Sequence, residues 1–431
     1  MIRRVPLIVV AAGLLLGTAG SALASQPFTI NFNNVDFNSG TMNGLVNSGG
    51  TLRLTSGTLP TYTYTDPYAS VPVLGDEVDG SGSYVYGTWT SDEYPMPHPF
   101  TQVVSSWNAR TSPGTWIKSE VLPKLSNGHW ADDWYTLGQW TYNDSDFHRT
   151  SLGGQGDADG FVAIDTWFAK DHPGVSYRLK LTIYRRTGMT EATAPVSVSR
   201  YSAVASNLRN EKRGFPSATT MNGVTKDLAL SPYSQETHHG HYPEFDNGGE
   251  AWCSPTSTAM VVRYWQERDQ AAHYAPDATE TAWVDPSFDA AVDYTARFVY
   301  DYHYQGAGNW PFNTAYAAER GLVGDVTQLH NLREAEPFIT ANIPLVASVA
   351  WSSNKLDTAI KSTNGHLMVI GGFTGTGDVI AYDPASDTNA QVRHTYDREQ
   401  FERAWIPASG GIVYVIRPPG FPTPSLTEHN D

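Results

Sequence analysis

The sequence has a single cysteine, Cys253, among its 431 residues. One cysteine cannot form an intrachain disulfide, so the disulfide-stapled scaffolds common among small secreted domains are excluded. A lone cysteine is either an inert buried thiol or a reactive one. Reactivity is favoured where a helix begins at the thiol and a histidine lies nearby, and the sequence predicts both conditions.

Basic residues are also scarce, with 28 Lys and Arg against 44 Asp and Glu and a net charge of -16. The N-terminal segment described next holds two arginines and no acidic residue, so its removal leaves a net charge of -18. This excess of negative charge argues against nucleic acid and anionic membranes as partners and favours solubility.

Long apolar runs are missing beyond the N-terminus. Residues 1–24 read as a signal peptide: two arginines precede an apolar run from Leu7 to Leu16, and small residues mark a cleavage site at Ala24-Ser25. The run is short for a bilayer span, and no later stretch is long enough. An uncleaved anchor is the alternative. We expect a secreted or cell-envelope protein with no membrane span.

The first half of the chain, residues 25–205, shows the pattern of a β-rich domain. Apolar and polar residues alternate over 177–184, and the segments 161–167 and 115–118 look similar. Clusters of Gly, Ser, Asp and Pro separate these segments, and no long helix is predicted before residue 210. Short strands with frequent turns indicate an all-β sandwich or jelly roll. The polar residues 206–227 are predicted to be a linker.

The second half, residues 228–417, has helical patterns first and strands later, which indicates an α+β domain. Residues 418–431 are Pro-rich and polar, so we expect a disordered tail. Helices are predicted over 254–268, 287–300 and 311–320, and strands over 345–349, 367–373, 379–382 and 412–416.

Three residues of this half can form a nucleophilic site. Cys253 lies at the predicted start of a helix, whose unpaired N–H groups favour a thiolate. If the strands that follow pair antiparallel around Thr374-Gly375, His366 faces Asp383 and shares its face of the sheet. A different turn would shift the register to Pro384 or Met368. Each residue alone is more often structural; together they favour a Cys/His/Asp site.

Four motifs occur in a characteristic order: Gln235, Trp252-Cys253-Ser254-Pro255-Thr256, Asn364-Gly365-His366 and Asp383-Pro384-Ala385. They resemble those of the double-glycine (bacteriocin-processing) peptidase family, above all its secreted, stand-alone relatives. That family is a branch of the papain-like cysteine peptidases. The resemblance covers about residues 228–417, and the first half is similar to the β-rich domain that often precedes the peptidase there.

The resemblance implies a papain-like fold and no cofactor. It makes Cys253 the nucleophile, His366 the base and acid, and Asp383 the residue that orients the histidine. It also implies a Gln before the nucleophile as oxyanion donor. Gln235 precedes Cys253 by 18 residues, with a predicted insertion between them, and Asn247 is the alternative. The backbone N–H of Cys253 contributes in either case.

Two further features have structural interpretations that we favour. His238-His239-Gly240-His241, near Glu244 and Asp246, could bind a metal, but the spacing matches no standard site, so no metal is predicted. Several tryptophans of the first half could form a sugar-stacking platform, but a structural core is favoured; they are Trp107, Trp116, Trp134, Trp140 and Trp167.

The sequence therefore predicts a secreted cysteine peptidase that hydrolyses peptide bonds of a peptide or protein substrate through an acyl-enzyme. Two alternatives stay open. One is a transglutaminase-type acyl transferase, which uses the same three residues with an amine acceptor. The other is a non-catalytic protein that contacts a cell surface or glycan through the N-terminal domain.

Overall fold

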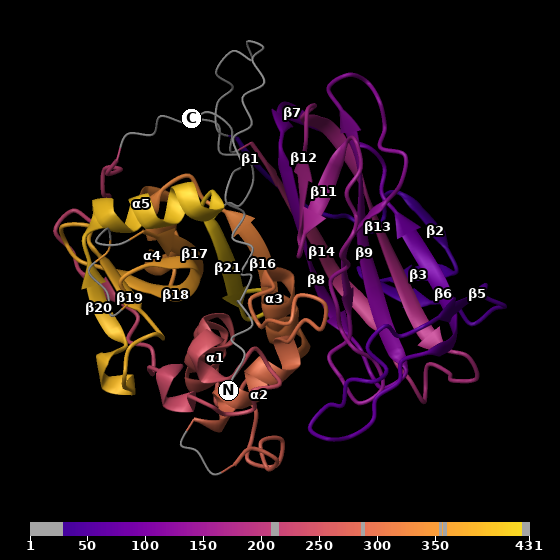
Figure 1. Cartoon of the computed structure of the whole chain (residues 1–431). Coiled ribbons are helices and arrows are strands. Elements are labelled where there is room, and N and C mark those ends of the chain that lie inside the picture. Colours follow the sequence, from indigo (N-terminus) through magenta and orange to yellow (C-terminus); the bar gives the residue numbers. More distant parts are fainter. Residues whose placement is uncertain (1–28, 208–214, 286–288, 353–355, 357–359, 425–431) are drawn as a thin grey trace, which may run out of the picture.

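The computed structural model describes residues 29–207, 215–285, 289–352, 356 and 360–424. The predicted signal peptide lies outside these residues. The chain forms two halves that lie side by side (Figure 1): the described residues 29–207 contain strands and no helix, whereas the rest mixes helices and strands. Among the described residues, no helix has both the length and the apolar character needed to cross a membrane.

The first half contains two seven-stranded sheets, ordered β11-β12-β8-β14-β4-β3 with β1 on β14, and β10-β9-β13-β6-β2 with β5 on β6 and β7 on β13. The alternating segment 177–184 lies within the long strand β13. The strands are β1 (Ile30–Asn34), β2 (Thr41–Asn43), β3 (Leu45–Ser48), β4 (Thr51–Leu54), β5 (Thr61–Tyr64), β6 (Gly82–Thr90), β7 (Tyr94–Phe100), β8 (Gln102–Arg110), β9 (Thr115–Leu125), β10 (Tyr135–Trp140), β11 (Gly160–Ala163), β12 (Thr166–Ala169), β13 (Gly174–Arg186) and β14 (Ser197–Ser206).

Side chains from the two sheets meet in a common interior. The ring of Trp89 on β6 lies 6.2 Å from that of Tyr201 on β14. The Ser119 hydroxyl on β9 contacts both the Ser105 hydroxyl on β8 and the Tyr201 hydroxyl, each at 2.7 Å. Four of the five tryptophans considered for a sugar platform are fully buried in the structure, namely Trp107, Trp116, Trp140 and Trp167. They therefore belong to the core and cannot stack on a glycan.

The predicted strand over 161–167 is wrong: the segment is a hairpin formed by β11 and β12. Its turn has Ile164 at φ 59°, followed by the buried Asp165. The Asp165 carboxylate accepts hydrogen bonds from the Thr166 hydroxyl and from the backbone N–H of Trp310 in the second half, both at 2.8 Å. Because this turn is held by a distant backbone N–H, the local apolar pattern does not reveal it.

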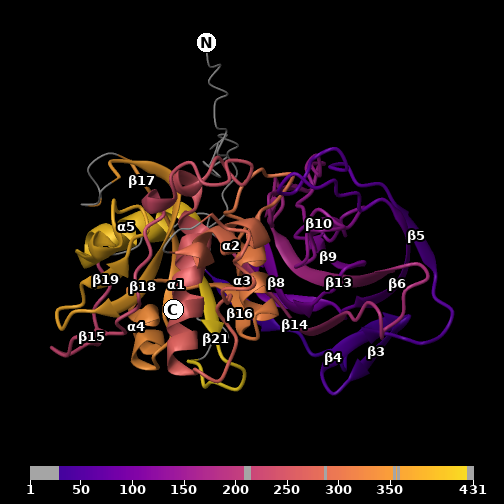
Figure 2. The same cartoon turned by 90° about the horizontal axis from the view of Figure 1, so that it is seen from below.

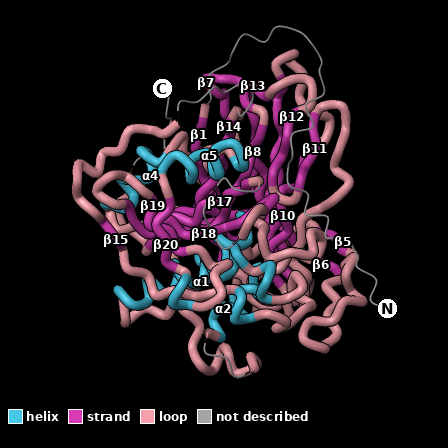
Figure 3. The backbone as a smooth tube through the Cα atoms, turned by 60° about the vertical axis from the view of Figure 1, so that its left-hand side comes forward, coloured by secondary structure: helices cyan, strands magenta, loops and turns pink. Residues whose placement is uncertain are grey.

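The second half has one antiparallel sheet, ordered β16-β21-β17-β18-β19-β20, with the short strand β15 beside β18. Helices α4 and α5 lie on one side of the sheet and α1 and α2 on the other (Figure 3). Its elements are β15 (Lys226–Asp227), α1 (Cys253–Arg268), α2 (Ala290–Val299), α3 (Trp310–Glu319), β16 (Val323–Gln328), α4 (Leu332–Thr340), β17 (Leu345–Trp351), β18 (Thr363–Phe373), β19 (Val379–Tyr382), β20 (Arg393–Tyr396), α5 (Arg398–Ser409) and β21 (Ile412–Arg417), with short 3₁₀ turns at Glu236–His238, Gly249–Ala251 and Asn389–Gln391.

Parts of the predicted linker and tail are held by the second half. The backbone N–H of Thr220 donates to Glu336 at 2.6 Å, and β15 pairs with β18. In the tail, the ring of Phe421 packs 4.9 Å from that of Trp265. Residues 418–424 of the predicted tail belong to the described residues, and 425–431 lie outside them.

Strand β16 is an edge strand of its sheet, and β8 of the first half lies beside it (Figure 2). Side chains of β8 cover this edge. Asn108 binds Gly324 twice: its amide donates to the Gly324 carbonyl at 2.7 Å and its side-chain oxygen accepts from the Gly324 N–H at 3.3 Å. The N–H of Val326 donates to the Ser106 hydroxyl at 3.1 Å. The first half thus satisfies backbone groups that a sheet edge leaves unpaired.

Buried charge also links the halves. The fully buried carboxylate of Asp325 on β16 accepts from Arg200 at 2.7 Å and from the Ser202 hydroxyl at 2.9 Å. Phe312 on α3 packs against Trp107 and Trp140, and one continuous apolar cluster includes residues of both halves. The halves share a core, while the exact domain boundaries stay a prediction.

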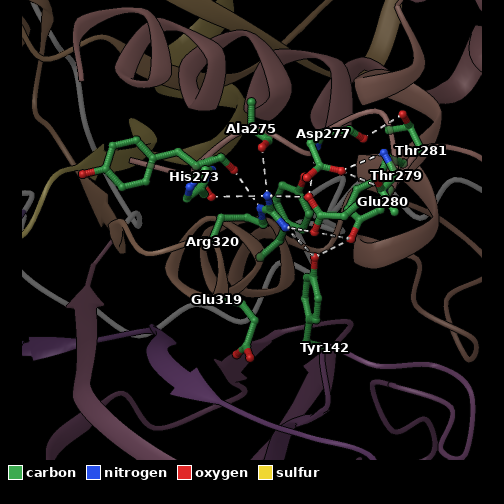
Figure 4. A network of polar contacts seen from close by, with 12 residues as sticks. Tyr142, His273, Ala275, Asp277, Thr279, Glu280, Thr281, Glu319 and Arg320 are labelled. Carbon is green, nitrogen blue, oxygen red and sulfur yellow. Dashed lines mark hydrogen bonds and ion pairs between the residues drawn. The ribbon is translucent and has the colours of Figure 1, made fainter. Parts of the chain in front are cut away.

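The end of α3 carries a second polar contact between the halves (Figure 4). Arg320 pairs with Glu280, donates to the Ala275 carbonyl at 2.9 Å, and reaches the Tyr142 hydroxyl of the first half at 3.4 Å. The neighbouring Glu319 points away from this network towards the first half. Glu319 therefore contacts the first half, whereas Arg320 mainly holds the segment around Glu280.

Glu319 is a carboxyl group that the junction partly buries. Burial raises its pKa to about 8, against the opposing effects of the Thr111 N–H and the Arg110 guanidinium. Because its pKa in the folded protein is above the unfolded value, its contribution to stability is complete in acid and is lost as the pH rises through about 8.

Glu319→Gln should therefore stabilise the protein at alkaline pH, because glutamine does not ionise. We expect its melting temperature to exceed that of the wild type by on the order of 2 °C at pH 9 and to match it near pH 4.5. Glu399→Gln, on an exposed carboxylate of α5, is the control and should change neither value. An equal difference at both pH values would contradict a titrating Glu319.

Candidate active site

Cys253 is the first residue of α1, and its side chain is partly exposed. Trp252 precedes the helix, and Pro255 lies in the first turn, where a missing N–H costs nothing. The unpaired N–H groups and the dipole of a 16-residue helix favour negative charge at this end. The expected position of the thiol at a helix start is therefore observed.

His366 lies on β18 with only 2% of its surface exposed. Its Nε2 is 2.7 Å from Oδ1 of Asp383. The Cys253 thiol lies within electrostatic range of the imidazole. Burial lowers the pKa of His366, but Asp383 and Cys253 raise it, and the net result is a pKa of about 10. The arrangement therefore favours the charged imidazolium near neutral pH.

Asp383 directly follows β19, and its backbone N–H donates to the Val392 carbonyl at 2.7 Å. Its carboxylate is fully buried. It accepts from the Tyr396 hydroxyl at 2.8 Å and from the Ala385 N–H at 3.1 Å, besides its contact with His366. Burial raises the pKa of Asp383, but the imidazolium and these hydrogen bonds bring it below the usual range. The carboxylate therefore stays ionised.

The strand register that led to this pair is different from the predicted one. Val369 pairs with Tyr382, and after a bulge at Gly371 the register shifts by one, so that Phe373 pairs with Val379. The turn is longer than expected and is closed by the Thr374 N–H on the Asp378 carbonyl at 2.9 Å. His366 and Asp383 still meet, because Asp383 lies just beyond the last paired residue of β19.

Two buried serines fix α1 against the sheet. The Ser257 hydroxyl donates to the Leu367 carbonyl, next to His366, at 3.1 Å. The Ser254 hydroxyl contacts the Tyr414 hydroxyl of β21 at 2.9 Å. Ser254 directly follows the candidate nucleophile, so its hydroxyl bonds the start of the helix to the sheet.

Gln235 is buried between two parts of the site. Its backbone N–H donates to the Pro384 carbonyl, next to Asp383, at 2.8 Å. Its side-chain amide donates to the Glu250 carbonyl at 2.7 Å and to the Glu236 carboxylate at 3.1 Å. Both of these acceptors require the NH₂ end of the amide, so its orientation is defined. The donor therefore lies against the loop that leads into Cys253.

Asn247 has a different setting. Its side chain is exposed, its φ is 62°, and its backbone N–H donates to the Pro243 carbonyl at 3.0 Å. The left-handed conformation identifies it as a turn residue of the insertion. The contacts of Gln235 make it the better candidate for the oxyanion donor.

Several aromatic residues near the site were not predicted. The Trp351 ring stands nearly perpendicular to His366 at 5.9 Å. Tyr396 and Tyr414 contact Asp383 and Ser254, as described above. Burial raises the pKa of Tyr304, and the negative charges of Asp246 and Cys253 add to the shift, so its hydroxyl lies within electrostatic range of the thiol. No local motif marks these residues.

The histidine run of the insertion divides into two environments. His238 and His241 both approach Asp293 of α2, which the sequence did not single out. His239 is exposed and pairs with Glu250 at 2.7 Å. Of the two acidic neighbours considered with the run, Glu244 is exposed, and Asp246 accepts from the Ala307 N–H at 2.9 Å.

Two cavities lie away from this site. One of about 410 Å³, between the halves, is lined in part by Arg110, Arg200 and Arg417. The other, of about 420 Å³, lies around Arg320. Neither is lined by the Cys, His and Asp of the candidate site, so polar geometry rather than a cavity identifies that site.

Comparison with protein families gives two matches. Residues 30–206 match the peptidase C39 N-terminal domain, and residues 227–413 match the peptidase C39-like family. The two matches together cover most of the chain. The chain therefore belongs to the peptidase C39-like family, as the motif order predicted.

Comparison with solved structures adds little. A C39-like peptidase from Bacillus anthracis is 16% identical, with a TM-score of 0.26, and the match covers 45% of this chain and 98% of that one. A structure of infectious bursal disease virus, Gx strain, is 10% identical, with a TM-score of 0.16, and the match covers 46% of this chain and 55% of that one. No curated protein matches the chain.

The oxyanion donor can be tested by substitution. Gln235→Ala should lower turnover of a peptide substrate by on the order of 100-fold or more, because a positioned N–H donor is lost. Asn247→Ala, in the insertion that follows Gln235, is the control and should change turnover little. The reverse order of the two effects would assign the donor role to Asn247. Unchanged alkylation of Cys253 in both variants would show that the nucleophile itself is intact.

Proposed function

We propose that this protein is an exported cysteine peptidase whose second half has a papain-like α+β fold. Cys253 is the nucleophile, His366 the general base and acid, and Asp383 the orienting residue. The carrying observation is the buried imidazole of His366, which contacts the Asp383 carboxylate on one side at 2.7 Å and interacts with the Cys253 thiol. This supports a thiolate–imidazolium pair at a helix N-terminus.

The proposed reaction follows from this pair. The Cys253 thiolate attacks the carbonyl carbon of a peptide bond, and the oxyanion accepts hydrogen bonds from the Cys253 N–H and the Gln235 amide. His366 protonates the leaving amine, and the C–N bond breaks to leave a thioester on Cys253. His366 then removes a proton from water, which attacks the thioester and releases the acid and the thiol.

In the protein without substrate, the side-chain amide of Gln235, the proposed oxyanion donor, already donates two hydrogen bonds. Both amide hydrogens of Gln235 are directed at acceptors, the Glu250 carbonyl and the Glu236 carboxylate. The bond to Glu236 is the longer of the two, and burial raises the pKa of that carboxyl. An arriving oxyanion therefore competes with Glu236 for one amide hydrogen in this mechanism.

Export and domain organisation complete the proposal. Cleavage near Ala24-Ser25 would release the chain outside the cell or into the envelope. We divide the mature protein into a β-rich domain over 25–205, a connecting segment over 206–227 and a peptidase domain over 228–417. The mass of the released chain and its N-terminal residue would test the cleavage site directly.

The triad assignment is testable by paired substitutions. Cys253→Ala and His366→Ala should each lower casein hydrolysis by on the order of 10⁶-fold, and Asp383→Asn by on the order of 10⁴-fold, as in other catalytic triads. The smaller effect is expected because Asp383 orients the imidazole and does not itself transfer protons. His172→Ala, at an exposed histidine of the first half, is the matched control and should retain full activity.

Iodoacetamide labelling separates the proposed enzyme from the alternatives. Labelling of Cys253 at pH 7 should be faster in the folded wild type than in unfolded protein, and slower in His366→Ala. A Cys253→Ala variant as active as the wild type would exclude the cysteine peptidase. Incorporation of a fluorescent primary amine into casein, with little hydrolysis, would instead indicate the acyl transferase.

A further inference from the structure

The histidine run and α2 form a second polar cluster outside the proposed triad. His238 and His241 come from the insertion, and Asp293 lies 52 residues after His241 in the chain. His238 Nδ1 is 2.9 Å from one Asp293 oxygen, and His241 Nδ1 is 2.8 Å from the other. Potential ligand atoms of the three residues lie within 4.8 Å of one another.

The cluster is buried but incompletely hydrogen-bonded. His238 is 1% exposed and Asp293 is fully buried. Within the part of the chain that the structure describes, neither ring nitrogen of His238 has a hydrogen-bond partner, and neither does Oδ2 of Asp293. The close approach of these two groups is not aligned as a hydrogen bond. Buried polar atoms of this kind need a partner, since leaving them unsatisfied costs free energy.

A metal ion would give one nitrogen of the His238 ring and Oδ2 of Asp293 the partner that they lack. Two imidazoles and a carboxylate are the ligand types that Zn²⁺ and similar ions prefer, whereas Ca²⁺ and Mg²⁺ prefer oxygen alone. Tetrahedral bonds of about 2.0–2.1 Å set ligand atoms about 3.3 Å apart. The two His–Asp separations of 2.8 and 2.9 Å fall short of this value, and the ligand atoms all lie within 4.8 Å of one another, so side-chain adjustment brings all three residues to one ion. His241 is 30% exposed, which provides an entry path.

We propose that His238, His241 and Asp293 bind one divalent first-row transition-metal ion of the zinc class, with solvent completing the coordination. Cys253 is not part of the cluster, so the ion has a structural role and leaves the thiol free. This proposal does not depend on peptidase activity.

The position of the cluster gives the ion a defined effect. His238 closes a turn on Gln235, its N–H donating to the Gln235 carbonyl at 3.0 Å. On the other side, the His238 ring lies 6.2 Å from that of Trp252, which directly precedes Cys253. An ion bound to His238 and to α2 therefore braces both the proposed oxyanion donor and the approach to the nucleophile.

Metal binding can be measured without any substrate. The experiment uses the untagged full chain carrying Cys253→Ala, so that no thiol can coordinate, and titrates ZnCl₂ against a chromogenic zinc chelator. We expect one Zn²⁺ per chain, with X-ray absorption showing nitrogen and oxygen ligands at about 2.0–2.1 Å. His241→Gln and Asp293→Asn should each weaken binding by on the order of 100-fold or more.

His239→Ala is the matched control, because His239 belongs to the same run but is exposed and paired with Glu250. It should bind Zn²⁺ as the parent does. Absence of stoichiometric binding, or equal binding by His241→Gln, would overturn the proposal. So would an equal loss in His239→Ala, which would indicate disruption of the loop. If Asp293→Asn unfolds by circular dichroism, the partly exposed His241 decides the question.

Discussion

A fully buried, ionised carboxylate at Asp383 is the constraint around which the second half is arranged. An unpaired charge at such depth would cost several kcal/mol. The structure compensates it with donors from separate segments: the imidazole of β18, the Tyr396 hydroxyl of β20 and the Ala385 N–H beyond β19. These bonds fix the edge of the sheet and the orientation of His366 together, so the geometry of the proposed site and the fold share the same contacts.

The proximity of His366 and Asp383 could be predicted from the sequence because each residue lies in or beside a strongly apolar strand. Cys253 begins helix α1, and the joint role of the three residues stays a prediction. The pairing survives an error in the turn, since the bulge at Gly371 and the longer loop shift the register without separating the two residues. Turn chemistry was the weaker signal, because Gly and Thr fit several turns equally well.

Other elements carry too little local signal. Strand β16 has Asp325 at its centre, a residue that period-two reasoning places at the surface and that Arg200 stabilises from another sheet. Helix α4 contains Pro337, which normally argues against a helix interior. The role of Asp293 can be recognised only from its contacts with His238 and His241, about fifty residues earlier in the chain. In each case the deciding partner is distant in the chain, so no window of sequence contains the information.

The bonds of Asn108 and Ser106 to the edge of β16 have a consequence for assembly. An uncovered strand edge is a template on which a second copy of the same sheet can add its own strand. Because Asn108 and Ser106 of β8 occupy these backbone groups, a second molecule cannot add a strand to the β16 edge. The β-rich half therefore protects the peptidase half from self-association, and losing or loosening it would favour oligomers joined edge to edge through β16.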